Sequence, residues 1–238
     1  MDVTPAALLG AGLAMGFGAI GSAVGEGFTA SEAARGMSRQ PRMQGELLRT
    51  MLVAQAIAES SGIFSLVVAA SLVFSRYDVS SFEAAMAVIG AGLAVGVAAI
   101  GCGTGCGLAG GRGCAGVARQ PGAARKITVT MLLSQALSES PAIFGFVIAL
   151  ILIISSHTGD SFVKGVALLG AGISMGAGGI GPGFGIGVAG MFACGAIAAR
   201  SRFSTEINRT LLIGAAVSES TSIYAFIVAI SLIYFSAG

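Results

Sequence analysis

Three glutamates recur at one constant interval in the most apolar parts of the sequence. They are Glu59, Glu139 and Glu219, and their surroundings are closely similar. Each lies about 12 residues into an apolar stretch, which in a helix is roughly 18 Å along the axis. An ionised carboxylate at that depth in a bilayer costs about 2.5–3.5 kcal/mol, so a neutral or ion-paired resting form is expected. A carboxyl that is neutral in lipid and ionised beside an aqueous channel can carry a cation. We predict this chemistry rather than a role as hydrogen-bonding glue between helices, because all three glutamates share one depth and one context.

A fourth acidic residue is expected beside the first glutamate. Arg42, in a predicted loop, lies almost midway along the sequence between Glu26 and Glu59, so the two carboxyls are predicted to lie at equal depth in one hairpin. The counterparts of Glu26 in the next two repeats are Cys106 and Ile186. Only the first repeat therefore pairs two carboxyls, and like charges so close are expected to share a proton.

Other polar residues beside the glutamates are candidate auxiliary groups at the ion site. Gln55 and Gln135 precede their glutamates by one helical turn and are expected to hydrogen-bond them. Hydroxyl-bearing residues follow the glutamates. The auxiliary candidates are Glu26, Gln55, Gln135, Ser60, Ser140, Ser220, Thr221 and Tyr224.

The composition indicates a membrane protein. Of the 238 residues, 55% are hydrophobic, 38 are glycine and only 10% are charged, against about 25% charged in soluble domains. This excludes a disordered chain, a basic nucleic-acid-binding domain and an ordinary cytosolic enzyme, and the four cysteines form no CxxC pair that would suggest a metal site. Six stretches reach the roughly 20 residues that cross a bilayer, and without period-2 alternation they predict an all-α protein with six transmembrane helices. They are residues 6–34, 47–75, 84–112, 127–155, 163–195 and 209–236.

The sequence repeats one predicted helical hairpin three times, and the three copies align without gaps. The second helices contain AQAIAESSGIFSLVVA, SQALSESPAIFGFVIA and GAAVSESTSIYAFIVA. The first helices contain GAGLAMGFGAIGSAVGEG, GAGLAVGVAAIGCGTGCG and GAGISMGAGGIGPGFGIG. The predicted repeats are residues 1–80, 81–160 and 161–238.

Small residues alternate along the first helix of each repeat. They are Gly21, Ala23, Gly25 and Gly27, then Gly101, Gly103, Gly105 and Gly107, then Gly181, Gly183, Gly185 and Gly187. On a helix, positions i and i+2 lie about 200° apart, so the small residues form two opposite smooth faces. Two such faces allow a close neighbour on each side. We therefore expect a closed, double-layered ring of several copies of the chain, with these helices packed inside.

Basic residues set the predicted orientation. Eleven of the 13 Lys and Arg lie near the loops that connect the two helices of each hairpin. The positive-inside rule places these loops in the cytoplasm and both termini on the opposite side. The formal net charge of +2 implies no nucleic-acid partner.

The repeats resemble the c subunit, or proteolipid, of F-type rotary ATP synthases. The resemblance covers essentially the whole chain, as a fusion of three units. It is carried by the glycine-rich first helices, by the glutamate of each second helix, by loop segments and by an Ile–aromatic pair after each glutamate. The loop segments are Ser38-Arg39-Gln40-Pro41 and Ala118-Arg119-Gln120-Pro121, and the pairs are Ile63-Phe64, Ile143-Phe144 and Ile223-Tyr224.

This resemblance implies a rotor component that is not an enzyme by itself and needs no cofactor. The ring would turn in an energy-coupling membrane, most simply the bacterial plasma membrane, against a stator a subunit whose arginine faces each passing glutamate. The basic loops would contact the central stalk. The residues to which this contact carries over are Arg39, Gln40, Pro41, Arg119, Gln120 and Pro121, and the third repeat has Ala199-Arg200-Ser201 instead.

The transported ion is predicted to be H⁺, with Na⁺ as the alternative. The resemblance implies that a Na⁺ site needs several oxygens, among them a carboxyl or amide on the first helix and a tyrosine hydroxyl on the second. Cys106 and Ile186 take the first position in two repeats, and Phe64 and Phe144 take the second in two repeats. Two other functions stay open at this point: a proteolipid of a V-type or archaeal-type pump, and, from a different class, a stand-alone secondary transporter.

Overall fold

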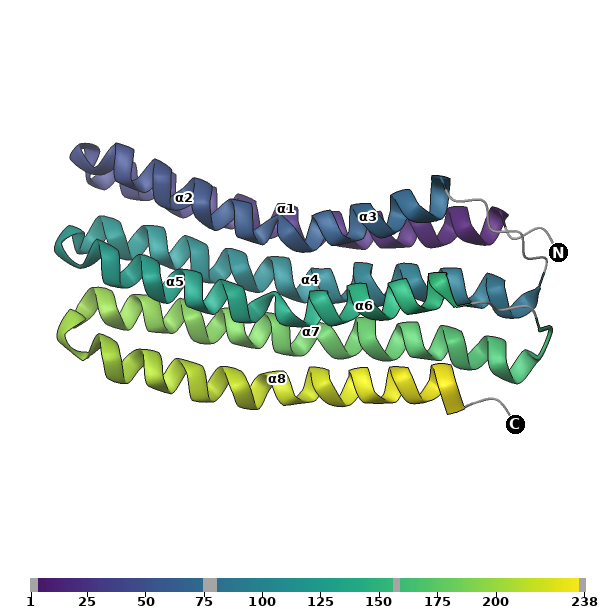
Figure 1. Cartoon of the computed structure of the whole chain (residues 1–238). Helices are drawn as coiled ribbons and strands as arrows, with labels where there is room; N and C mark the ends of the chain where they lie inside the picture. Colours follow the sequence, from purple (N-terminus) through teal and green to yellow (C-terminus); the bar gives the residue numbers. More distant parts are fainter. Residues whose placement is uncertain (1–3, 75–80, 156–158, 236–238) are drawn as a thin grey trace.

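Three helical hairpins lie side by side in the computed structural model, which describes residues 4–74, 81–155 and 159–235 (Figure 1). The first hairpin contains α1 (Thr4–Arg39), η1 (Pro41–Met43), α2 (Gln44–Ala58) and α3 (Ser60–Phe74). The second contains α4 (Phe82–Arg119), η2 (Pro121–Ala123), α5 (Ala124–Ser138) and α6 (Ser140–Ile154). The third contains α7 (Phe162–Ala199), η3 (Ser201–Phe203) and α8 (Ser204–Phe235). The predicted all-α fold is confirmed, while the repeat boundary at residue 80 lies outside the described residues.

Six helical segments within the described part of the chain are long and apolar enough to cross a membrane, as the sequence predicted. They run for 34 to 38 residues, which is longer than the predicted spans. The first helix of each hairpin continues past the apolar stretch to Arg39, Arg119 or Ala199. The prediction placed these ends too early because it followed hydropathy, whereas alanine and arginine extend a helix as readily as leucine does.

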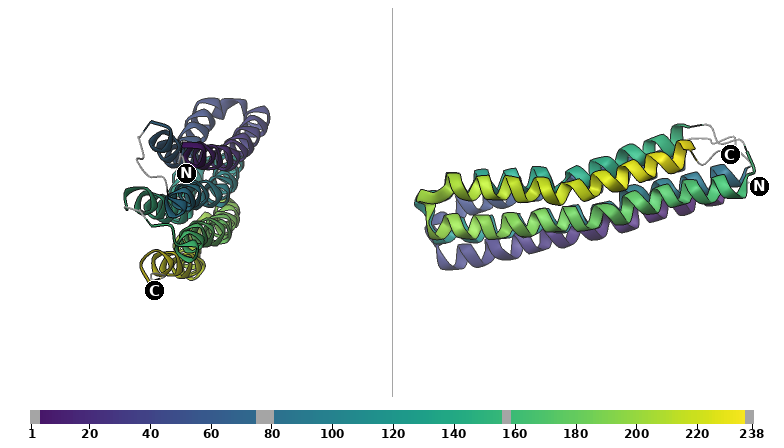
Figure 2. Two further views of the ribbon diagram at one scale, coloured as in Figure 1. Left: turned by 90° about the vertical axis from the view of Figure 1, so that its right-hand side faces the viewer. Right: turned by 90° about the horizontal axis from the view of Figure 1, so that it is seen from below.

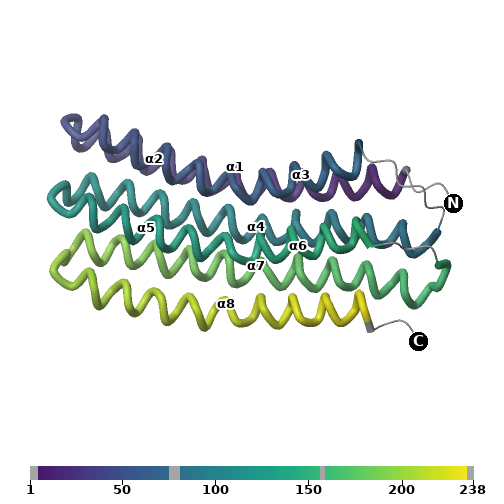
Figure 3. The backbone as a smooth tube through the Cα atoms, in the orientation of Figure 1, coloured from purple at the N-terminus to yellow at the C-terminus, as the bar shows by residue number. Residues whose placement is uncertain are grey.

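The hairpins form two layers. An inner row consists of α1, α4 and α7, with α4 between the other two, and an outer row consists of α2–α3, α5–α6 and α8 (Figure 2). Figure 3 shows that α1 begins and α8 ends at the end of the bundle opposite the three loops within the hairpins. This arrangement places the three glutamates on the outer row and the glycine-rich helices on the inner one.

Glycines set the spacing of the inner row. A Cβ added at Gly103 would lie 2.5 Å from the carbonyl carbon of Gly21, and one added at Gly183 would lie 2.8 Å from the backbone nitrogen of Cys102. Gly107 and Gly25 are in similarly close backbone contact. α4 therefore uses one small-residue face against α1 and the opposite face against α7, which confirms for this helix the predicted packing on two sides.

The same tight loop closes each hairpin. The backbone N–H of Gln40 donates to the Gly36 carbonyl at 2.9 Å, and the corresponding residues Gln120 and Arg200 repeat this bond at 2.9 and 2.8 Å. All three residues adopt φ near −140° and ψ near 74° before a short 3-10 turn. The third loop reaches this conformation with Ser201 in place of proline, so the proline is not needed for the turn.

Candidate ion-carrying site

The three glutamates occupy equivalent places on the outer helices. Glu59 lies between α2 and α3, Glu139 lies between α5 and α6, and Glu219 lies within the continuous helix α8. The helical hydrogen bonding continues through the first of these junctions, because the Glu59 N–H donates to Gln55 at 2.9 Å and its carbonyl accepts from Ile63 at 3.0 Å. Each carboxyl thus projects from a helix near the middle of a membrane-spanning segment.

Glu139 is the most enclosed of the three. Its exposed fraction is 5%, because its hairpin is flanked on both sides by hairpins of the same chain. One carboxyl oxygen, Oε1, lies 3.2 Å from the Cys106 sulfur. The other, Oε2, is buried without a hydrogen-bond partner among the described residues. Because an unpartnered buried carboxylate oxygen is expensive, this atom is well placed to hold a proton.

The two glutamines donate hydrogen bonds to backbone carbonyls and not, as expected, to the glutamates one helical turn away. Gln135 is fully buried, and its Nε2 donates to the backbone carbonyls of Ala54 at 2.9 Å and Cys106 at 3.0 Å rather than to Glu139. Gln55 likewise donates to the Glu26 carbonyl at 3.1 Å. One helical turn brings an amide near its glutamate, but backbone carbonyls of neighbouring helices, including Ala54 on the outer helix α2, accept its N–H groups instead. Gln135 therefore joins its own hairpin to the first one.

Glu26 and Glu59 line one pocket of about 230 Å³ on the flank of the first hairpin. The structure thus brings together the two carboxyls whose equal depth the spacing from the loop predicted. Ser22, Gly62 and Leu66 line the same pocket.

The hairpin of Glu219 has an apolar residue where the other two hairpins have a carboxyl and a thiol. Ile186, at the position of Glu26 and Cys106, is fully buried. The hydroxyls of Ser220 and Thr221 donate to carbonyls of their own helix, at 2.7 and 2.9 Å, and Ser60 does the same at 3.4 Å. Tyr224 is 62% exposed. These candidate hydroxyls do not converge on a glutamate within the chain, and Ser140 is half-buried beside Glu139.

Sequence reasoning missed a set of hydroxyls that link neighbouring hairpins. Ser138 donates to the Gly183 carbonyl at 2.6 Å, Ser134 to Ile186 at 3.2 Å, and Thr29 to Gly107 at 3.2 Å. Each hydroxyl is buried. Their signal in the sequence was the presence of small hydroxyl residues within apolar helices.

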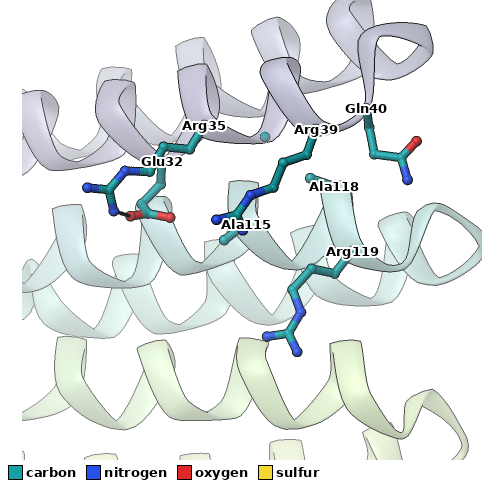
Figure 4. A pocket seen from close by; sticks show the side chains of 8 residues that line it. Glu32, Arg35, Arg39, Gln40, Ala115, Ala118 and Arg119 are labelled. Atoms are coloured by element: carbon teal, nitrogen blue, oxygen red, sulfur yellow. Dashed lines mark hydrogen bonds and ion pairs between the residues drawn. The ribbon is translucent and has the colours of Figure 1, made fainter.

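A second pocket lies at the loop end, between the first and second hairpins. Its volume is about 160 Å³, and it is lined by the predicted loop residues Arg39, Gln40 and Arg119 (Figure 4). Arg35 also lines it and pairs with Glu32 at 2.8 Å. Pro41 and Pro121 begin the adjacent 3-10 turns, and Gln120 lines a third pocket beside Arg200. The loop residues therefore present an exposed basic surface at this end of the bundle.

Comparison with known proteins decides the family. The family model for the ATP synthase C subunit matches three times, over residues 9–72, 89–152 and 169–232. The chain belongs to the ATP synthase C-subunit family. The three matches begin at equivalent positions of the three repeats and contain all three glutamates, in agreement with the predicted triple fusion.

Individual relatives carry two kinds of name. The K subunit of the A-type ATP synthase of Methanocaldococcus jannaschii is 32% identical over 222 residues, which cover 93% of each chain. The ATP synthase c subunit of Petrotoga mobilis is 57% identical over 67 residues, 28% of this chain and 70% of the relative. The chloroplastic c subunit of Ostreococcus tauri is 50% identical over 78 residues, 33% of this chain and 95% of the relative.

The chain is accordingly an integral multi-pass membrane protein and a proteolipid subunit of an ATP synthase. Proteins of this family are non-catalytic rotor components, for which assembly into a ring is typical. Relatives named as c subunits and a relative named as an A-type K subunit both match the chain, so family membership by itself does not specify the class of ATP synthase.

Proposed function

We propose that this chain forms the rotor ring of an F-type ATP synthase and carries H⁺ on Glu59, Glu139 and Glu219. A glutamate facing lipid would hold its proton, because an ionised carboxylate there is costly. The same glutamate would release the proton where a stator a subunit presents an arginine and an aqueous path. Rotation of the ring would then couple proton flow to ATP synthesis, and no cofactor is needed for this step.

The observation that carries the proton assignment is the contact between Cys106 and Glu139. A thiol at 3.2 Å is an adequate hydrogen-bond neighbour for a protonated carboxyl. It is a poor ligand for Na⁺, a hard cation that prefers oxygen. Ile186 offers no ligand at all at the corresponding position in the third hairpin. Since every glutamate must pass the stator in turn, the site least suited to Na⁺ determines the ion.

The remaining partners follow from the surface of the molecule. The exposed basic loops are suited to contact the central stalk, with Arg39, Gln40 and Arg119 at the pocket between hairpins. The excess of basic residues at these loops favours their placement in the cytoplasm. Both termini then lie on the opposite side of the bacterial plasma membrane. Lipid covers exposed apolar side chains of the outer row, such as Ile227.

A second candidate is the rotor of an A-type enzyme. The relative that covers nearly the full length of the chain is an A-type K subunit. Against it, the Arg-Gln-Pro loops in two of the three repeats are the feature that resembles F-type proteins. Identification of the subunits that purify with this chain separates the two candidates, because F-type and A-type enzymes have different stalks and catalytic heads.

The ion is tested with the purified complex in liposomes. An imposed pH gradient without Na⁺ should drive ATP synthesis, and a Na⁺ gradient at constant pH should not. The reverse result would contradict the proton assignment. A proton ionophore is the control, since it should abolish synthesis.

A further inference from the structure

Helix α4 keeps one open side, which we call its inner face. The helix is covered by α1, by α7 and by the outer row, so only the side away from the outer row is free (Figure 2). Partly exposed residues recur there every three or four positions, and the rest of the helix is buried. From Met86 to Leu108 these residues are apolar except Thr104, whose hydroxyl donates to the Ile100 carbonyl at 2.6 Å.

The apolar part of the inner face has the length of a bilayer core. At 1.5 Å per residue, the distance from Met86 to Leu108 is about 33 Å. The hydrocarbon core of a bilayer is roughly 30 Å thick. The inner face of α4 therefore has the length and the composition of a surface that lipid covers.

Arg112 is the first charged residue at the loop end of this apolar surface. It follows Cys106, whose sulfur contacts Glu139, by six residues, so its Cα lies about 9 Å from the level of that glutamate. Arg112 is exposed, and within residues 4–74, 81–155 and 159–235 its guanidinium has no ion-pair or hydrogen-bond partner. A charge so close to the middle of a membrane is costly unless it reaches a counter-charge or polar headgroups.

The other two hairpins need no such counter-charge at the equivalent position. Glu32 takes the place of Arg112 in the first hairpin, where it pairs with Arg35 at 2.8 Å. Phe192 takes it in the third hairpin and is 67% exposed. Among the described residues, Arg112 is thus the one cation at this level of the inner face that lacks a counter-charge.

The third hairpin leaves space beside Arg112. A Cβ added at Gly195 of α7 would lie 3.1 Å from the Arg112 Nε, so the arginine extends across a position that has no side chain. A Cβ added at Gly190 would lie 3.3 Å from that of Ala109. These two contacts bracket Phe192 and place it at the level of Arg112. An exposed cation therefore lies beside an exposed phenyl group, where the apolar surface ends.

We propose that Arg112 binds the phosphate of an anionic phospholipid on the inner face, one lipid per chain, with its acyl chains along the apolar stripe of α4 and beside Phe192. A guanidinium matches a phosphate through paired N–H donors, and basic positions between membrane helices suit anionic headgroups. An acidic protein segment fits less well, because the surface that continues from Arg112 is apolar over the thickness of a bilayer core. The proposal does not depend on which ion Glu139 carries.

Native mass spectrometry of the detergent-purified ring measures the binding. Added phosphatidylglycerol should fill one preferred site per chain. Phosphatidylcholine, whose headgroup has no net charge, should bind about tenfold more weakly, the factor that one hydrogen bond to a charged group represents. Equal binding of the two lipids would overturn the proposal. Inorganic phosphate in excess should not displace phosphatidylglycerol, because it makes no contact with the apolar stripe; displacement would indicate a site for free anions and would contradict the lipid assignment.

Substitution of the arginine tests its role. Arg112→Gln should abolish the preference for phosphatidylglycerol over phosphatidylcholine, while Arg112→Lys should keep it because the charge remains. Arg42→Gln is the matched control, since it removes an exposed arginine from the tip of the first loop, and it should leave the preference unchanged. The same spectra report the mass of the ring, so a failure to assemble is seen separately. An Arg112→Gln ring of normal mass that still prefers phosphatidylglycerol would show that Arg112 does not bind the lipid.

Discussion

At the scale of single residues, the three glutamates share a position but not an environment. Glu139 has a thiol beside one oxygen and no partner for the other among the described residues, Glu59 shares a pocket with Glu26, and the hairpin of Glu219 has Ile186 at the position of Glu26 and Cys106. A proton tolerates all three environments because it needs only the carboxyl itself. A larger ion needs several ligands at every site.

The first prediction concerns labelling of these carboxyls. A hydrophobic carbodiimide should modify all three glutamates in the assembled ring, because it requires a protonated acid in an apolar site, and labelling should decline as rising pH ionises them. Millimolar Na⁺ should not protect Glu139, since Cys106 supplies no hard oxygen. Mass spectrometry of peptides measures each site separately. Glu59 is the internal comparison, because its neighbour Glu26 makes it the best candidate for Na⁺; protection of all three sites would contradict the proton assignment.

At the scale of helices, sequence patterns predicted most of the architecture. Hydropathy indicated the six spans, the regular internal repeat indicated three hairpins, and the alternating small residues indicated an inner helix packed on both sides. These features are periodic or are summed over many residues, so they can be recognised in the sequence without knowledge of tertiary contacts.

What the patterns missed depends on such contacts. The amide of Gln135 bonds Ala54 of another hairpin, and Ser138 bonds Gly183 across a junction. Neither partner can be found by counting along one helix, because the register between two hairpins is fixed only when their glycine faces interlock. The helix ends at Arg39 and Arg119 were missed for a simpler reason, namely that a helix does not stop at the edge of the apolar stretch.

The second prediction tests the interlocked inner row. Gly107→Ala should destabilise the chain by about 1–3 kcal/mol, the usual cost of overpacking, because the new methyl group meets the backbone of Gly25. Gly45→Ala is the matched control in open space on the outer row, and it should leave stability unchanged or slightly higher. Thermal unfolding in detergent compares the two. Equal stability of both variants would mean that the inner helices are not in close contact.

At the scale of the whole molecule, the chain is an open arc with two complementary edges. The glycine positions that contact the preceding inner helix in the second and third hairpins are open on the first hairpin. Further copies of the chain can therefore add at this edge until the arc closes. Each copy would bring three glutamates, and the number of ion sites in the ring would be a multiple of three.

The third prediction separates the fold of the chain from its assembly. Gly16→Val should leave the chain folded, because Gly16 has open space, and should abolish the ring, because the edge it occupies receives the next copy. Gly96→Val, the same change at the equivalent internal position, should disturb the chain itself. Native mass spectrometry and circular dichroism report the two effects. A Gly16→Val ring of normal mass would show that this edge is not used.

The central claim is that every glutamate carries a proton through the same stator in turn. ATP-driven proton pumping by complexes that contain Glu139→Gln in every chain tests it most directly. Glu83→Gln is the matched control: Glu83 is a buried carboxyl at the start of α4 that accepts a hydrogen bond from the Ser161 N–H at 3.1 Å, and a glutamine oxygen can accept the same bond. We predict that Glu139→Gln assembles normally but pumps no protons even though Glu59 and Glu219 are intact, while the control pumps normally. Normal pumping by Glu139→Gln would contradict the account.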